Sequence, residues 1–118
     1  MTAATSTFFG AWGMADVKDR KTAIAESFAP DGRYSDPRTD APLTGSDAVT
    51  EYVGMFSQYA PGAVAEVTQT ETRDGVTRAT IAFRMPDGMQ QTGQYFITYT
   101  DRGLISHMIG FAGTGASE

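Results

Sequence analysis

The sequence contains no cysteine and only one histidine, His107. The absence of thiols excludes a disulfide framework and a cysteine nucleophile. With one imidazole, a metal site would need carboxylates and carbonyls almost alone, and no ligand spacing of the EF-hand kind occurs in the chain. We therefore expect neither a metal site nor a bound cofactor.

Positive charge is scarce as well. Nine Lys and Arg residues stand against 14 Asp and Glu residues, which gives a net charge of −5. A nucleic-acid surface requires clustered Lys and Arg, whereas the only basic group here is the short run 18–21, at a predicted helix start. We expect that run to lie in solvent, and we expect no nucleic-acid partner.

Long apolar stretches are also missing. No segment approaches membrane-spanning length, and residues 1–14 lack the charged start and the longer apolar core of a secretory signal. We therefore expect a soluble, cytoplasmic protein with no membrane partner. The hydrophobic fraction of 41% and the aromatic fraction of 11% are sufficient for one compact domain with a bulky core, spanning residues 1–118.

Apolar residues at helical spacing predict three helices in the first half of the chain. The first begins near residues 5–7 and carries Trp12. The second runs from Val17 to a breaker cluster at residues 30–32. The third follows a segment that resembles a capping box, residues 44–47, and has a continuous apolar stripe.

The second half predicts an antiparallel meander of four strands. Asp-Gly pairs at residues 74–75 and 87–88 are typical hairpin turns, and the flanking segments alternate apolar and polar side chains. The predicted strands are residues 63–72, 76–85, 90–100 and 104–111. Helices gathered before strands indicate an α+β fold, with the helices on one face of an antiparallel sheet.

Asp36 is the most informative residue of the chain. Pro37 favours an extended backbone at Asp36, and alternation along a strand places Tyr34 and Asp36 on the same side. A carboxylate directed at the apolar side of a sheet must be paired or put to use, so Asp36 is our leading candidate for chemistry. The alternative is a turn aspartate that bonds to local amides, since Asp before Pro is common in loops.

The order of these elements, together with several short motifs, resembles the nuclear-transport-factor-2-like superfamily. The chain resembles in particular its SnoaL-like (polyketide cyclase-like) and ketosteroid-isomerase-like members, and the resemblance covers essentially the whole chain. The residues that carry it are Phe28-Ala29, Asp31, Tyr34-Ser35-Asp36-Pro37, Leu43-Thr44-Gly45, Val49, Tyr52 and Gly103-Leu104-Ile105-Ser106-His107.

The resemblance implies a single SnoaL-like domain with a cone-shaped fold. A strongly curved antiparallel sheet wraps around the N-terminal helices and leaves a deep pocket open at one end. The resemblance also implies a homodimer formed through the outer face of the sheet. In the isomerase-like members the aspartate of the Asp-Pro step is the general base, and this position corresponds to Asp36.

Two parts of the family's catalytic sites are absent here. The isomerase-like members place a phenol on the first helix, where this chain has Phe8 or a neighbouring aromatic residue, and a protonated carboxyl on a strand, near Gln94 or Tyr95. The cyclase-like members place an aspartate two residues after the last-strand histidine, where this chain has Ile109. The resemblance therefore indicates the fold more specifically than the reaction.

Asp36 and His107 are the candidate catalytic pair. His107 shares its alternation phase with Ile105, so we expect it to face the helices and the pocket, where a carboxylate and an imidazole in reach of one another could move a proton at neutral pH. We expect Tyr34 to polarise a ligand oxygen, with cross-strand packing as the alternative. The residues expected to contact a ligand are Trp12, Tyr34, Tyr52, Phe56, Phe83, Met85, Tyr95 and Ile109.

Three functional hypotheses follow from these observations. The first is an acid/base enzyme of the isomerase, cyclase or dehydratase type, acting on a small, mostly apolar carbonyl compound. The second is a noncatalytic module that binds a hydrophobic small molecule. The third is an assembly domain that dimerises through its sheet and has only a vestigial cavity. An enclosed cavity into which Asp36 opens would favour the first two.

Overall fold

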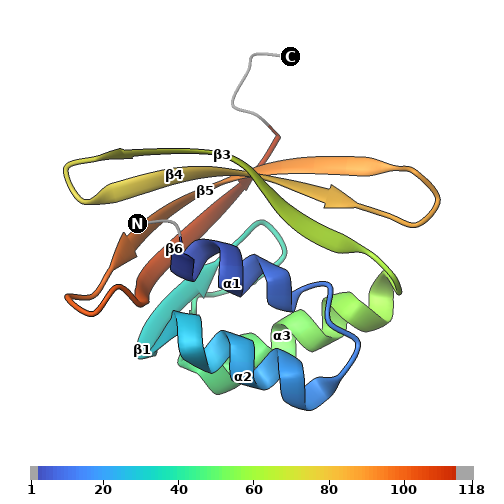
Figure 1. The fold of residues 1–118 in the computed structure, drawn as a ribbon, viewed down its shortest axis with the longest axis horizontal. Coiled ribbons are helices and arrows are strands. Elements are labelled where there is room, and N and C mark those ends of the chain that lie inside the picture. Colours follow the sequence, from blue (N-terminus) through green and yellow to red (C-terminus); the bar gives the residue numbers. More distant parts are fainter. Residues whose placement is uncertain (1–2, 114–118) are drawn as a thin grey trace.

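The computed structural model describes residues 3–113. Three helices lie against one side of a six-stranded sheet (Figure 1). The helices are α1 (Ala3–Ala11), α2 (Val17–Ser27) and α3 (Ser46–Tyr59). The strands are β1 (Phe28–Ser35), β2 (Leu43–Thr44), β3 (Val64–Arg73), β4 (Val76–Arg84), β5 (Gln90–Tyr99) and β6 (Ile105–Ala112). The predicted α+β class is confirmed.

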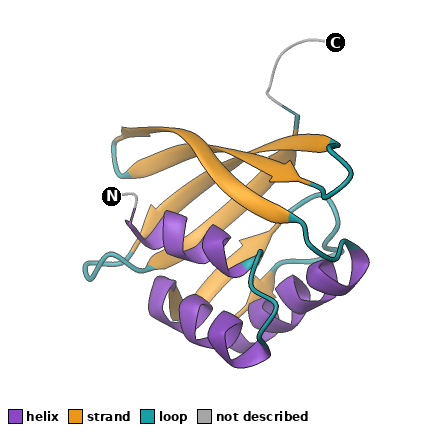
Figure 2. Ribbon diagram, turned by 45° about the vertical axis from the view of Figure 1, so that its right-hand side comes forward, coloured by secondary structure: helices purple, strands orange, loops and turns teal. Residues whose placement is uncertain are grey.

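The sheet is curved and open, with the strand order β2-β1-β6-β5-β4-β3 (Figures 1 and 2). Strands β3 to β6 form the predicted antiparallel meander. In contrast, β1 pairs with β6 in parallel, so the prediction of a wholly antiparallel sheet is wrong in this detail. In the chain, α3 and the strands β3, β4 and β5 precede β6. Local periodicity therefore carries no information about whether β6 runs parallel or antiparallel to β1.

Bulges contribute to the curvature of the sheet. The register shifts between Val67 and Gln69 in the β3–β4 pair and between Thr98 and Tyr99 in the β5–β6 pair. An extra residue on one strand bends it and increases the local twist. The long strands therefore curl over the helices, which produces the concave face that the resemblance implies.

Two predicted helix boundaries differ from the structure. β1 begins at Phe28, directly after α2, so the predicted breaker at residues 30–32 lies inside a strand. Gly32 permits this path, because a Cβ there would lie 2.7 Å from the Phe28 ring and 2.9 Å from the carbonyl oxygen of Ile105. The predicted capping box before α3 is also wrong: Gly45 is the N-cap, with a φ of 91° and no side-chain capping bond.

The core lies between the three helices and the concave face of the sheet. Phe8 and Phe9 of α1 are fully buried, as are Ile81 of β4 and Ile97 of β5. The predicted inward phase of β4 and β5 is therefore confirmed for these strands. Within residues 3–113, no helix has the length and apolar character that a membrane crossing requires.

Candidate functional site

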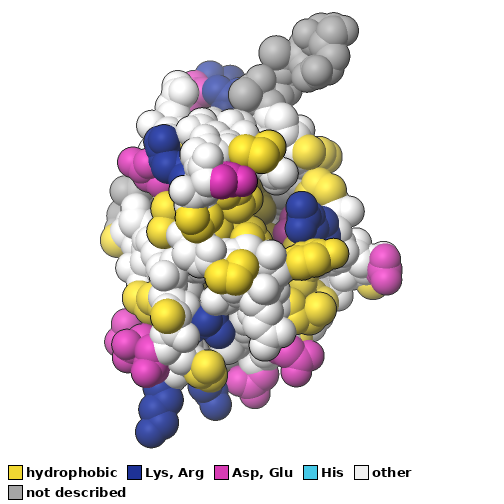
Figure 3. All heavy atoms as spheres, turned by 90° about the vertical axis from the view of Figure 1, so that its right-hand side faces the viewer, with side chains coloured by type: hydrophobic (Ala, Val, Ile, Leu, Met, Phe, Trp, Pro, Cys, Tyr) yellow, Lys and Arg dark blue, Asp and Glu magenta, His cyan; other side chains and the backbone are white. Residues whose placement is uncertain are grey.

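A cavity of about 360 Å³ opens at the end of the molecule formed by the second half of α3 and the β4–β5 hairpin. Figure 3 views this end and shows hydrophobic side chains gathered among charged ones. Six of the predicted site residues line the cavity: Trp12, Asp36, Tyr52, Phe56, Phe83 and Tyr95. The wall also contains Pro37, Arg38, Met55, Tyr59, Gln91, Thr92, Gly93, Phe111 and Ala112.

Asp36 lies in the cavity wall just after the end of β1, and its two oxygens have different environments. Oδ2 accepts hydrogen bonds from the hydroxyls of Tyr34 and Tyr52, each at 2.6 Å. Oδ1 accepts one from the backbone N–H of Arg38 at 2.8 Å. The Asp36–Thr39 segment adds a tight turn, in which the Thr39 N–H donates to the Asp36 carbonyl. One oxygen of Asp36 thus caps a local turn, as the alternative for this residue predicted, and the other accepts bonds from inside the molecule.

Three phenols form a directed chain of hydrogen bonds that ends at this carboxylate. The Tyr34 hydroxyl lies 3.2 Å from that of Tyr95. Because Tyr34 has one hydroxyl proton and donates it to Asp36, Tyr95 must be the donor in the bond to Tyr34. The hydroxyl proton of Tyr52 is also donated to Asp36. All three phenol protons are therefore already engaged within the protein.

Burial keeps these phenols protonated. Desolvation by burial raises the pKa of Tyr34 well above the usual value for tyrosine, and the neighbouring Tyr95 and Asp36 raise it further. Burial also raises the pKa of Tyr52 and of Tyr95, an effect that the Arg38 guanidinium partly offsets. The three hydroxyls therefore remain hydrogen-bond donors throughout the physiological pH range.

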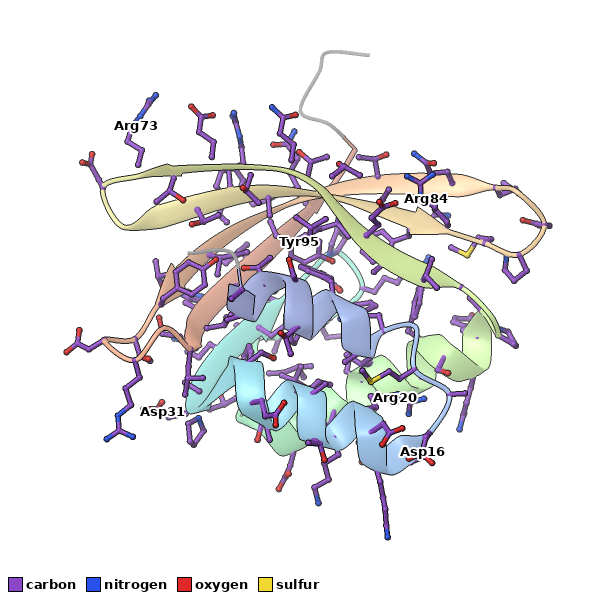
Figure 4. The ribbon with its side chains drawn as sticks, in the orientation of Figure 1. Asp16, Arg20, Asp31, Arg73, Arg84 and Tyr95 are labelled. Atoms are coloured by element: carbon purple, nitrogen blue, oxygen red, sulfur yellow. The ribbon has the colours of Figure 1, made fainter. Side chains whose placement is uncertain are left out.

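Close backbone approach fixes the position of Tyr95, which points from β5 into the space between the sheet and α1 (Figure 4). Its ring lies directly against Gly110, the residue opposite it on β6. A Cβ on Gly110 would lie 2.5 Å from Cε2 and 2.8 Å from Cζ of the Tyr95 ring. A glycine at this position allows the Tyr95 hydroxyl to reach Tyr34.

His107 does not face the pocket, contrary to our expectation. Its partner residues across the sheet are Arg33 and Thr98, while the next residue, Met108, is the one fully buried in the core. His107 therefore lies on the outer face, opposite to Tyr34 and Asp36. The register shift in the β5–β6 pair leaves Ser106 as an extra residue, and this reverses the phase that simple alternation from Ile105 predicts.

Three other expectations also fail. Ile109 follows the outward phase of His107, and Met85 lies at the β4–β5 turn, so neither residue lines the cavity. Tyr34 is fully buried behind the wall and donates its proton to Asp36, so it cannot polarise a ligand oxygen. Sequence analysis missed Arg38, the only Lys or Arg among the described residues of the cavity wall, although its position two residues after Asp36 could have indicated it.

No carboxylate or imidazole cluster of metal-binding type accompanies the site. Among residues 3–113, no three His, Cys, Asp or Glu side chains lie close enough together to hold a metal ion. The chemically active groups of the cavity are therefore a carboxylate, its phenol donors, an indole and a guanidinium.

No protein-family model matches the sequence, and no curated protein matches it. Solved structures do match. A candidate isomerase of the SnoaL-like family from Agrobacterium tumefaciens has a TM-score of 0.85 at 21% identity, over 95% of this chain and 96% of that one. A candidate polyketide cyclase from Sinorhizobium meliloti has a TM-score of 0.67 at 23% identity, over 93% of this chain and 94% of that one.

A third solved structure is a protein with a ketosteroid isomerase-like fold from Catenulispora acidiphila, in complex with trimethylamine. It has a TM-score of 0.73 at 13% identity, over 91% of this chain and 82% of that one. These similarities confirm the predicted fold, which is that of the SnoaL-like and ketosteroid-isomerase-like proteins. At such identities they establish the fold alone.

Proposed function

We propose that this protein is an acid/base enzyme that enolises a small, mostly apolar carbonyl compound, leading to an isomerisation, cyclisation or dehydration. The observation that carries the proposal is the Asp36 carboxylate in the wall of an aromatic cavity, fixed by two phenol donors on one oxygen. A carboxylate fixed in an apolar pocket is a common arrangement for a general base.

The arrangement of donors favours Oδ1 of Asp36 for the proposed proton transfer. Oδ2 already accepts hydrogen bonds from two phenols. Oδ1 accepts a hydrogen bond only from the backbone N–H of Arg38 and retains a free lone pair. In the first step, Oδ1 takes the proton from the carbon next to the substrate carbonyl, and the electrons of the C–H bond pass to the carbonyl oxygen. In the second step, Asp36 returns the proton to another carbon, which completes an isomerisation.

The phenol network does not need to rearrange during this cycle. When Oδ1 is protonated, Oδ2 is the carbonyl oxygen of the acid and still accepts from Tyr34 and Tyr52. General acid–base catalysis contributes about 10²–10⁴-fold in rate. An enhancement of this size is sufficient for enolising an activated ketone.

The conversion of cyclohex-3-enone to its conjugated isomer tests the proposal, because the product can be followed by its ultraviolet absorbance. We expect the wild-type protein to accelerate this conversion and Asp36→Asn to abolish the acceleration. The asparagine keeps an oxygen that can accept the two phenol bonds and loses only the bond from the Arg38 backbone N–H, so circular dichroism should show an unchanged fold. His107→Gln is the matched control and should retain the activity, because His107 lies on the outer face of the sheet.

Two outcomes would contradict the proposal. Equal turnover by wild type and Asp36→Asn would remove this carboxylate from the mechanism. Loss of turnover in His107→Gln, with the fold intact, would return the imidazole to the site and would require a different proton path.

The alternative function is a noncatalytic module that binds a hydrophobic ligand. The trimethylamine complex of the Catenulispora protein supports it, because rings such as Trp12 and Phe56 beside a carboxylate are suited to a small alkylammonium ion. This hypothesis predicts binding of tetramethylammonium and recovery of unchanged cyclohex-3-enone after long incubation with the protein. Recovery of the conjugated isomer would exclude it.

A further inference from the structure

Arg38 contributes an exposed guanidinium to the wall of the cavity. The residue lies in the turn after β1, and it is the only Lys or Arg among the described residues of that wall. Most of the remaining wall is apolar or aromatic, and Figure 3 shows charged side chains bordering the hydrophobic ones at this end of the molecule. In such a pocket the few polar groups fix the orientation of the ligand.

The guanidinium of Arg38 forms no ion pair and no hydrogen bond with any described residue. Only its backbone N–H is engaged, in the bond to Oδ1 of Asp36. Arg84 of the sheet, which is also exposed, is by contrast paired with Glu66 at 2.8 Å. An arginine side chain carries five N–H donors and a permanent positive charge. These donors of Arg38 therefore remain available to a ligand in the cavity.

The carboxylate of Asp36 does not neutralise Arg38, although the two residues are close in sequence. Its oxygens accept hydrogen bonds from two phenols and one backbone N–H, and such bonds stabilise the negative charge without a counter-ion. The charge of Arg38 nevertheless acts inside the cavity: burial raises the pKa of Tyr52 and of Tyr95, and Arg38 opposes that rise. The site thus combines a carboxylate that is already satisfied with a guanidinium that is not.

We propose that Arg38 binds a carboxylate group of the ligand, so that the compound on which the site acts is a small oxo acid with an otherwise apolar body. The planar guanidinium can pair with a carboxylate through two parallel hydrogen bonds, while rings such as Phe56 and Phe83 contact the apolar part. The cavity volume of about 360 Å³ lies near the lower end of the range for ligand pockets, which suits a small compound. The inference rests on the proposed function, because it names the substrate class of the same site.

Three compounds that share one ring and differ in charge test the proposal: cyclohexanecarboxylate, the neutral cyclohexanecarboxamide and the cationic cyclohexylmethylammonium ion. NMR titrations of nitrogen-labelled protein at pH 7 measure their affinities. We expect the carboxylate to bind about 3- to 30-fold more tightly than the amide, a range between the values for an exposed ion pair and for a hydrogen bond to a charged group. Equal affinities of these two compounds, tightest binding of the ammonium ion, or binding of none of the three would overturn the proposal.

Variants of two arginines identify the source of the preference. Arg38→Gln should abolish the preference for the carboxylate over the amide, and Arg38→Lys should retain part of it, because the charge is kept but the planar set of donors is lost. Arg33→Gln is the matched control: Arg33 is also exposed, but it lies opposite His107 on the outer face of the sheet and outside the cavity wall. This variant should retain the preference. An equal loss in Arg38→Gln and Arg33→Gln would show a general effect of net charge and would refute the assignment.

Binding can be measured without catalysis, so this test and the test of the proposed function can fail separately. In Asp36→Asn the preference for the carboxylate should persist and increase, because a like charge in the same cavity is removed. A preference for the carboxylate in a protein without isomerase activity would support the role of Arg38 and exclude the proton transfer. Loss of the preference in a folded Asp36→Asn protein would refute the role of Arg38.

Discussion

The buried phenol network predicts a specific loss of stability at alkaline pH. In the unfolded chain a tyrosine ionises with a pKa of about 10, whereas burial raises the pKa of Tyr34 and of Tyr95 in the folded protein. A group whose pKa is raised by folding stabilises the native state fully below the unfolded value and loses that contribution as the pH rises. Alkali should therefore unfold this protein by ionising these tyrosines in the unfolded state.

The magnitude follows from proton linkage. Above pH 10 each such tyrosine reduces the free energy of unfolding by about 1.4 kcal/mol per pH unit. Tyr34 and Tyr95 together should therefore remove about 3 kcal/mol by pH 11, with a smaller contribution from the partly exposed Tyr52. This is a large share of the about 5–15 kcal/mol by which a typical domain is stable.

The variant Tyr34→Phe distinguishes destabilisation by the buried phenols from alkaline denaturation caused by other groups. At pH 7 the variant should lose about 1.5–3 kcal/mol, the value of a hydrogen bond to a charged acceptor. Above pH 10 its stability should fall with roughly half the slope of wild type, because one of the two buried tyrosines, Tyr34 and Tyr95, is gone. Tyr59→Phe removes a phenol that is 83% exposed and should leave the stability at pH 7 unchanged.

Urea unfolding monitored by circular dichroism between pH 7 and pH 11 measures these slopes, and the tyrosinate absorbance of the folded protein provides an independent check. Equal slopes for wild type and Tyr34→Phe would refute the reasoning. So would a folded protein in which all five tyrosines ionise together near the value of the free amino acid.

The remaining predictions concern packing and assembly. Gly110→Ala should destabilise the protein by about 1–3 kcal/mol, the usual cost of overpacking, because the new Cβ would displace the Tyr95 ring. Gly10→Ala should instead stabilise it by about 0.5–1 kcal/mol, because the space around its Cβ is open. Urea titrations measure both changes. The homodimer through the sheet stays a prediction: Phe96 and Phe111 form an exposed ring pair on β5 and β6, and Phe111→Ser should lower the dimer fraction in analytical ultracentrifugation. A wild-type monomer at micromolar concentration would exclude both the dimer and the assembly-domain hypothesis.

Local signals in the sequence predicted most of the fold. The Asp-Gly turn after β3 adopts the left-handed conformation at both residues, Asp74 (φ 54°) and Gly75 (φ 81°), as a hairpin of this type requires. The predicted alternation of inward and outward side chains along β4 and β5 is also confirmed. Each of these features depends on neighbours a few residues apart, which is the range over which propensity and periodicity act.

Predictions failed where a single extra residue or a distant partner decides the outcome. The bulge at Ser106 turned His107 outward, and nothing in the sequence around it distinguishes a bulged strand from a regular one. Asp36 was predicted to lie on a strand and to face the inner side of the sheet; it lies in the cavity wall just after β1, and its hydrogen bonds were not predicted. Tyr52 reaches it from α3 and Tyr95 joins the network from β5, and such contacts arise only from the tertiary fold.

The polar groups of the cavity together define the proposed ligand more narrowly than any one of them does. Oδ1 of Asp36 and the oxygen of Tyr95 retain free lone pairs, so both can only receive a proton or a hydrogen bond. The Arg38 guanidinium in the cavity wall can only donate one. A compound that matches this pattern presents an acidic hydrogen on one side and an acceptor oxygen on another, within an otherwise apolar body. An enolisable ketone has both groups on adjacent carbons, whereas a hydrocarbon has neither.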